Sequence, residues 1–347
     1  MVDLKAIYLT TLERCAPERL IRAHVTPDLP RNVVAIGKCA GALLDGVAAV
    51  HDVAHAFVAL PDGYRAPVTH AEIHRGGHPR MTHASFEAGR ALLDFVDGHD
   101  DILFLVSGGG SACVEVALPP HSEAELIEEN ARLVASELPI GAINARRRAL
   151  SAIKGGRLGA RVRGRAVALI YSDVARGRLD DVASGPVANG TLIADNTTLV
   201  RAAAEVIGER AVVIDEQLEA DVEDVARTLA STKLARGRIL VAGGEPTVRI
   251  RGDGRGGRCT ELAVRFAMHS RAEALFASSD GVDGNSGVAG IHLTRRNERL
   301  DDAVANAELA VSNSYRIAAQ VGEPIMIAPT GNNLRDLFLV TADEAFG

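Results

Sequence analysis

The feature that most constrains the fold is a series of short apolar runs, each followed by a turn and a segment with helical spacing. These runs are NVVAIG (32–37), HAFVAL (55–60), DILFLV (101–106) and AVALIY (166–171). Near-continuous apolar runs between helices are typical of strands buried on both faces of a parallel sheet. We therefore expect an α/β fold in which the first 190 residues form one doubly wound parallel sheet.

The length of 347 residues favours about two domains. Residues 191–235 are rich in Ala, Glu and Arg with helical spacing, and they predict a helical connector. From residue 238 the pattern changes to short strands separated by glycine-rich turns. We expect an N-terminal domain over residues 1–235, with the connector included, and a smaller α/β domain over residues 236–347.

Composition excludes several classes of partner. The net charge is −7, Trp is absent and aromatic residues make up 3% of the chain, which argues against nucleic-acid binding. The four cysteines lie far apart, so neither a disulfide framework nor a structural zinc site is expected, and the cytoplasm is the expected location. No run approaches 18 apolar residues, so we expect no membrane span. The oligomeric state stays open, with a homo-oligomer among the alternatives.

The segment SGGGSA (107–112) directly follows an apolar run and is the first candidate for chemistry. Open parallel sheets bind ligands at the carboxyl ends of their strands, and glycine amides at a helix start can approach a phosphate closely. We predict a phosphate site there; its residues are Ser107, Gly108, Gly109, Gly110 and Ser111. A tight strand-to-helix turn without a ligand is the alternative.

Lysine accounts for only four of the 38 basic residues, so a lysine beside glycine at the end of a strand is informative. Lys38 follows NVVAIG, and Lys154 precedes a glycine pair and Arg157. A compact ammonium group can hold a phosphoryl oxygen as a point charge. We predict that these three side chains contact phosphate, with an ordinary surface position as the alternative.

Carboxylates and arginines in loops complete the candidate site. Asp173 follows an apolar run, where it could accept a hydroxyl proton or hold Mg²⁺, although turns also favour Asp. In GDGRGGR (252–258), Arg255 and Arg258 form a candidate clamp for phosphate charge, against a plain hairpin turn.

Further carboxylates lie in glycine-rich loops that suit Mg²⁺ with a phosphate, although solvated turns have the same composition. They are Glu245, Asp280 and Asp283, of which Glu245 and Asp283 are the candidate metal ligands. His78 in GGHPR is a candidate loop residue near the ligand, because Gly76, Gly77 and Pro79 rule out a histidine-bearing helix there.

The order of these motifs resembles the class II glycerate kinases, a two-domain family with a C-terminal module called MOFRL and members often labelled hydroxypyruvate reductases. The motifs that carry the resemblance are GKCAG, GGHP, LVSGGGSA, INARRRALSAIKGGRL, SDVARG, ASGP, GGEPTV, GDGRGGR, SDGVDG and TGNNLRDL. The resemblance covers about residues 30–190 and 238–342. It implies a Rossmann-like large domain, with the active site in a cleft between it and the small domain.

The resemblance also implies a reaction: ATP- and Mg²⁺-dependent phosphorylation of D-glycerate at its C-2 hydroxyl, so that a small hydroxy acid and ATP are the partners. Lys38 matches the family's G-K lysine, and Arg255 and Arg258 match its G-R-G-G-R pair. Asp173 matches the S-D-V aspartate and Asp280 the D-G aspartate. The resemblance therefore assigns phosphoryl transfer to these five residues.

The chain departs from the family pattern in the loops that would meet the acceptor. The differing segments are residues 80–82, 259–260, 285–288 and 332–335. A different sugar acid or polyol is therefore an alternative acceptor. Alternatives of another class are an NAD(P)H-dependent hydroxypyruvate reductase and an inactive nucleotide-binding protein. The absence of a G-x-G-x-x-G motif after a buried strand argues against the reductase.

Overall fold

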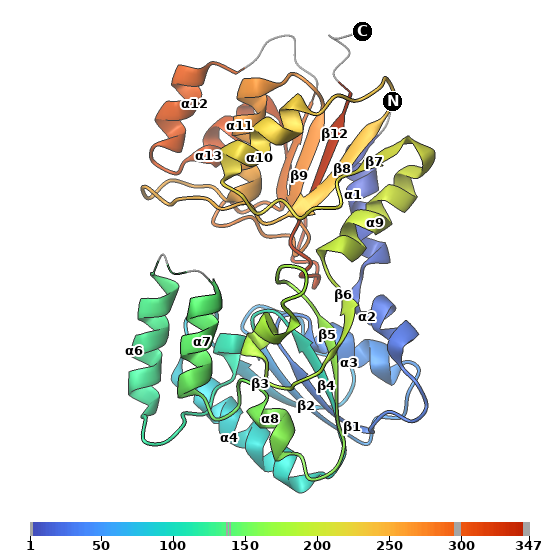
Figure 1. Cartoon of the computed structure of the whole chain (residues 1–347), viewed down its shortest axis with the longest axis vertical. Coiled ribbons are helices and arrows are strands. Elements are labelled where there is room, and N and C mark those ends of the chain that lie inside the picture. The colour runs from blue at the N-terminus through green and yellow to red at the C-terminus, as the bar shows by residue number, and fades with distance from the viewer. Residues whose placement is uncertain (1–2, 137, 139, 295–299, 343–347) are drawn as a thin grey trace. The chain divides into compact units, whose positions relative to one another are not determined.

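The computed structural model describes residues 3–136, 138, 140–294 and 300–342. The chain divides into two compact units (Figure 1). Residues 16–195 form one, which we call the parallel-sheet unit, and residues 1–15 together with 196–347 form the other, which we call the mixed-sheet unit.

The parallel-sheet unit contains six strands in the order β3-β2-β1-β4-β5-β6, all parallel to their neighbours. The strands are β1 (Asn32–Ile36), β2 (His55–Pro61), β3 (Glu72–Gly76), β4 (Ile102–Ser107), β5 (Ala166–Tyr171) and β6 (Thr191–Ala194). The four apolar runs of the sequence form its four central strands, which confirms the expected parallel sheet.

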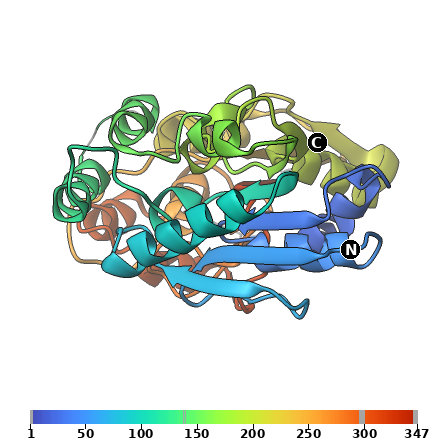
Figure 2. The ribbon, with the colours of Figure 1, turned by 90° about the horizontal axis from the view of Figure 1, so that it is seen from below.

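Helices cover both faces of this sheet, as a doubly wound fold requires. On one face, Leu92 and Phe95 of α4 pack with Val34, Ile36 and Phe104 of the strands. Helix α3 packs against β1, β2 and β4, and Figure 2 shows α4 running alongside the strands. The helices of the unit are α2 (Pro17–Leu20), α3 (Ala40–Ala48), α4 (His83–Gly98), α5 (Gly110–Cys113), α6 (Glu123–Val134), α7 (Ile140–Leu150) and α8 (Arg157–Arg161).

The mixed-sheet unit contains a sheet of order β11-β10-β9-β12-β8-β7, in which β7 and β8 are parallel and the other neighbours antiparallel. The strands are β7 (Ala211–Val213), β8 (Ile239–Gly244), β9 (Ala274–Ser278), β10 (Gly290–Leu293), β11 (Glu323–Ile325) and β12 (Asp336–Thr341). Helices α10 (Val222–Ser231), α11 (Arg258–His269), α12 (Asp302–Leu309) and α13 (Ser314–Val321) lie on one face. Helices α1 (Leu4–Arg14) and α9 (Asn196–Ile207) lie on the other (Figure 1).

No described helix has the length and apolar character needed to cross a bilayer.

The compact units differ from the expected division near residue 235. Helix α9, which lies in the expected connector, packs on β7 and β8 and so joins the mixed-sheet unit. The connector also contains the strands β6 and β7. The N-terminal helix joins the mixed-sheet unit too, because the Tyr8 hydroxyl donates to the Ser278 carbonyl at 2.7 Å. The division into two units is set by where each helix buries its apolar face. The composition of the sequence does not change at these points, so it could not predict the division.

Two local features follow from particular residues. Residues 4–20 form two helices, α1 and α2, because Pro17 begins a new helix after Cys15. Beyond β8, Thr247 makes only an isolated bridge with Asp221 and belongs to no strand.

The Tyr8 contact predicts that α1 stabilises the mixed-sheet unit. Replacement Tyr8→Phe removes a fully buried hydrogen bond, and we expect it to lower the free energy of unfolding by about 1–2 kcal/mol. Urea unfolding followed by circular dichroism measures the change. Tyr315→Phe makes the same chemical change in the half-buried Tyr315 of this unit and should have a smaller effect. Equal unfolding midpoints for Tyr8→Phe and the parent would contradict the contact.

Candidate functional site

The turns that end β1 and β4 lie against each other. Gly37 has φ +109°, and a Cβ there would lie 2.4 Å from the carbonyl oxygen of Ser107. The amide of Lys38 donates to the carbonyl of Gly108 at 2.8 Å. Because both strands are parallel and in register, their carboxyl ends place the G-K and SGGGSA segments side by side.

The side chains of Lys38 and His78 meet at Gly109. A Cβ on Gly109, which has φ +82°, would lie 2.9 Å from Lys38 Cγ and 3.4 Å from His78 Cδ2. Lys38 Nζ lies 5.7 Å from the centroid of the Tyr64 ring, a residue that the sequence did not single out. The structure thus brings three of the candidate residues together, and their function stays a prediction.

The hydroxyl of Ser107 has a structural role that differs from the expected phosphate contact. Ser107 is fully buried; its Oγ donates to the Ile36 carbonyl at 3.2 Å and accepts from the Cys39 amide at 3.0 Å. The hydroxyl therefore ties the end of β1 to the end of β4. Gly110 begins α5, which has only four residues, so the helix offers little dipole to an anion.

Ser111 belongs to a polar network that the sequence did not reveal. Its hydroxyl lies 2.8 Å from the hydroxyl of Ser184, which donates to Asn144 Oδ1 at 3.0 Å. Ala183 and Ser184 have φ values of +50° and +60°, a conformation that is costly for residues with a Cβ. The ASGP segment, which the sequence presented as a simple turn, is the signal that could have pointed to this network.

The sequence predicted that Lys154 and Arg157 contact phosphate, but both side chains have partners within the protein. Lys154 is 1% exposed and forms an ion pair with Glu115, which is equally buried. Glu115 also accepts from Ser151 Oγ at 2.5 Å and from the Val116 amide at 2.9 Å. Burial lowers the pKa of Lys154, and the Glu115 carboxylate opposes that shift.

The Arg157 guanidinium donates to three backbone carbonyls around the same turn, those of Arg148 at 2.7 Å and of Ser151 and Lys154 at 3.1 Å. Both cations therefore hold the KGGR turn in place. Their proximity to glycines in the sequence could not distinguish this role from phosphate binding.

Asp173 lies at the same edge of the parallel sheet as Gly109. In the register of β4 and β5, Ser107 is opposite Tyr171, and Asp173 follows two residues later. Its side chain is half-buried. Its place is the one expected from the sequence, and its role stays a prediction.

In the mixed-sheet unit, Arg258 begins α11 and is held by two carboxylates. Its Nη1 lies 2.7 Å from Glu245 Oε1, and its Nε lies 3.2 Å from Asp336 Oδ2. Burial alone would lower the pKa of Arg258, but Asp336 and Glu245 raise it above its ordinary value. The arginine charge is therefore fixed.

Asp336 is a site residue that the sequence did not single out. It is fully buried, and its Oδ1 has no hydrogen-bond partner among the described residues. Burial raises its pKa, against the opposing effect of Arg258. Arg335 also joins the group, with its Nε 3.1 Å from Glu245 Oε2. The TGNNLRDL motif, which contains both residues, was the available signal.

The two carboxylates predicted as metal ligands have other partners. Asp283 is buried at the start of α11, where Oδ1 accepts from the Cys259 amide at 2.8 Å and Oδ2 from the Thr260 amide at 2.9 Å. Glu245 pairs with Arg258 and Arg335. The described residues contain no group of three or more His, Cys, Asp or Glu side chains that could hold a metal ion. The structure thus does not support a metal site at Glu245 or Asp283.

Arg255 and Asp280 occupy neighbouring loops of the mixed-sheet unit. The exposed Arg255 guanidinium lies 4.0 Å from the centroid of the Tyr315 ring, and its Nε donates to the Ser286 carbonyl at 2.5 Å. Asp280 Oδ1 accepts from Ser278 Oγ and from the Val282 amide, both at 2.9 Å. Each side chain is oriented by its partners and stays a candidate for contact with substrate.

The Asp283 cap predicts a pH dependence. Burial raises the pKa of Asp283 to about 6, although the two amides oppose the shift. Because the pKa of Asp283 in the folded protein lies above the ordinary aspartate value of 3.8, the stabilising contribution of this group is present at about pH 4 and is lost as the pH rises through 6. We expect the difference in unfolding free energy between the parent and Asp283→Asn to shrink or reverse in favour of Asp283→Asn over that window. Urea unfolding at a series of pH values measures it, and a constant difference would contradict the shift.

The buried ion pair between Lys154 and Glu115 predicts that Lys154 stabilises the folded protein. We expect Lys154→Met to lower the free energy of unfolding by about 3–5 kcal/mol, because it leaves the Glu115 charge buried and unpaired. Lys154→Met with Glu115→Leu should recover part of the loss. The exposed Lys233→Met is the control and should change stability by less than about 0.5 kcal/mol. If urea unfolding shows equal stability for Lys154→Met and the parent, the structural role is wrong.

Two family models match this chain, one over each of its two parts. Residues 3–227 match the model of the domain of unknown function DUF4147, and residues 238–336 match that of the MOFRL family. A D-glycerate 2-kinase from Thermotoga maritima is 27% identical over 95% of each chain. A putative hydroxypyruvate reductase from Agrobacterium vitis is 29% identical over 90% of this chain and 87% of its own.

The fold has a close counterpart among solved structures. The crystal structure of a glycerate kinase from Thermotoga maritima superimposes with a TM-score of 0.84, at 26% identity and with 98% of each chain covered. The two family models together span most of the chain, and the structural match extends over nearly all of it. The chain therefore belongs to the DUF4147 family, with a MOFRL domain as its C-terminal part.

Proposed function

We propose that this protein is a glycerate 2-kinase, which transfers the γ-phosphoryl group of ATP to the C-2 hydroxyl of D-glycerate. The observation that carries the proposal is the match to the T. maritima D-glycerate 2-kinase over 95% of both chains. The match in fold to a glycerate kinase structure supports the same activity. We also propose a cytoplasmic location, as is usual for an enzyme that uses ATP.

Three cationic side chains of the candidate site suit phosphoryl transfer. This reaction depends mainly on positioning and on positive charge around the phosphoryl oxygens. We assign that role to Lys38, Arg255 and Arg258. Arg258 is well suited to it, because Glu245 and Asp336 fix the direction of its guanidinium before any substrate binds.

The proposed step moves one phosphoryl group and one proton. The C-2 oxygen of glycerate forms a bond to the γ-phosphorus of ATP, and the bond from that phosphorus to the β,γ-bridging oxygen breaks. ADP leaves with the electron pair of the broken bond. The hydroxyl proton passes to a carboxylate, for which Asp173 and Asp280 are the two candidates.

ATP enters this reaction as its magnesium complex. In such complexes the ion is held largely by phosphate oxygens and water, with one or two protein carboxylates. That requirement fits this chain, whose described part lacks a larger acidic cluster. Asp173 and Asp280 are candidates for this contact as well as for the proton, whereas Glu245 and Asp283 have other partners.

A reductase acting on hydroxypyruvate is the second candidate, because a relative carries that name. The run GDGRGG (252–257) has the glycine spacing of a dinucleotide-binding turn. However, β8 ends at Gly244, so the run does not directly follow a strand as that turn requires. The geometry therefore favours the kinase.

One assay tests both candidates. Purified protein with Mg²⁺ and ATP is given D-glycerate, other sugar acids and polyols, and ADP release is followed, while NAD(P)H oxidation is followed with hydroxypyruvate. We expect ADP release with D-glycerate and 2-phosphoglycerate as the product by ³¹P NMR. NAD(P)H oxidation without ADP release would refute the kinase.

We expect Lys38→Ala to lower kcat by at least about 100-fold, because an oriented cation is lost from the transition state. Lys5→Ala, at an exposed position of α1, is the matched control and should keep full activity. Circular dichroism checks that both variants are folded. Near-parent activity for Lys38→Ala would overturn the assignment of this lysine.

A further inference from the structure

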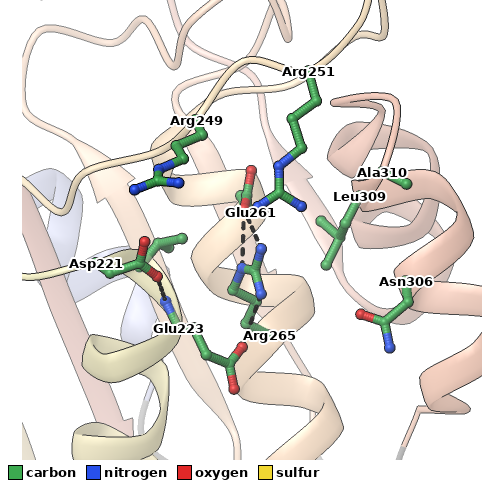
Figure 3. A pocket seen from close by; sticks show the side chains of 10 residues that line it. Asp221, Glu223, Arg249, Arg251, Glu261, Arg265, Asn306, Leu309 and Ala310 are labelled. Atoms are coloured by element: carbon green, nitrogen blue, oxygen red, sulfur yellow. Dashed lines mark hydrogen bonds and ion pairs between the residues drawn. The ribbon is translucent and has the colours of Figure 1, made fainter. Parts of the chain in front are cut away.

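The mixed-sheet unit contains a pocket of about 220 Å³ that none of the candidate site residues lines. It lies where α10 begins, beside α11 and the end of α12, and the loop that carries Arg249 and Arg251 borders it (Figure 3). Its volume corresponds to several water molecules of about 30 Å³ each. The pocket is thus large enough for a small organic molecule.

Two arginines balance the two glutamates of this pocket: Arg265 contacts both of them, and Arg227 Nε lies 2.8 Å from Glu223 Oε1. Arg265 lies 2.7 Å from Glu261 Oε1 through its Nη2 and 2.9 Å from Glu223 Oε2 through its Nη1. Asp221 Oδ1 accepts from the Glu223 amide at 3.0 Å and caps α10. Of these carboxylates, only that of Asp221 lacks an arginine partner among the described residues.

Arg249 and Arg251 supply the unbalanced charge. Neither guanidinium has a carboxylate partner in the part of the chain that the structure describes, and both residues are exposed. Figure 3 shows the Arg251 side chain pointing toward Glu261 of α11 and the Arg249 guanidinium above Asp221. Because Arg227 and Arg265 balance Glu223 and Glu261, the two guanidinium groups of Arg249 and Arg251 remain against the single carboxylate of Asp221, which leaves one net positive charge for an incoming anion.

The chemistry of the lining selects the ligand. Planar guanidinium groups bind phosphate through paired hydrogen bonds. The Asn306 amide and the Asp221 carboxylate can accept hydrogen bonds from hydroxyl groups. None of the lining residues is aromatic, so a nucleotide base would have no ring to stack on.

We propose that this arginine pocket binds a small hydroxylated organic phosphate, at a site separate from Lys38, Arg255 and Arg258. The inference does not rest on the proposed kinase activity. Arg249 and Arg251 hold the phosphate group, and the polar side chains below them receive the hydroxyl groups. The lack of carboxylate partners for these two arginines is then accounted for by the ligand.

Isothermal titration calorimetry with sn-glycerol 3-phosphate, at constant ionic strength, tests the proposal. We expect saturable binding by the parent protein and none with glycerol. The variant Arg249→Ala with Arg251→Ala should bind at least about tenfold more weakly, since it loses two charged hydrogen-bonding groups. The lack of saturable binding by the parent, or equal affinity in this variant, would overturn the site.

The matched control is Lys233→Ala with Arg236→Ala, which removes two exposed cations of the same unit outside the pocket. We expect its affinity to stay within about twofold of the parent. An equal loss in this control would mean that net charge alone attracts the anion and would overturn the pocket.

A third variant separates the pocket from the proposed active site. Lys38→Ala with Arg255→Ala should keep the affinity for glycerol 3-phosphate, whereas its loss there would place the anion at those residues and overturn a separate site. Because the kinase assay is a different measurement, absence of ADP release together with retained pocket binding would refute only the proposed function.

Discussion

The contact between the ends of β1 and β4 is the constraint on which the parallel-sheet unit's candidate site depends. Two parallel strands in register end at the same edge, and Ser107 ties them through one donated and one accepted hydrogen bond. Gly37 has no Cβ, which allows the close approach of its backbone to the Ser107 carbonyl. The Lys38 side chain therefore leaves the turn beside Gly109 and His78.

The mixed-sheet unit uses its buried carboxylates to orient arginine and backbone groups. Glu245 and Asp336 hold Arg258, and Asp283 receives two amides of the helix that Arg258 begins. A buried acid with such partners is costly to move, since each partner would lose its hydrogen bonds. This arrangement fixes the direction of the Arg258 guanidinium before any ligand binds.

Particular residues show how far the sequence could predict the site. Lys38, Gly109 and Asp173 follow apolar strands, and the geometry of a parallel sheet places such residues at one edge. Lys154 also neighbours glycines, yet it is buried against Glu115, which lies 39 residues away in the sequence. Asp336 was missed for the same reason, because its contact with Arg258 spans 78 residues. Contacts between side chains so far apart in the sequence leave no pattern in the residues around either partner.

The sequence by itself determined the α/β class, the parallel sheet and the family, because apolar periodicity and ordered motifs are local and survive without coordinates. Only the tertiary structure decided which charges are already paired and which helices complete each unit. Helix α1 joins strands that follow it by more than 200 residues, and Arg157 donates to backbone carbonyls. Such outcomes depend on burial and on partners distant in the chain, which composition and spacing do not encode.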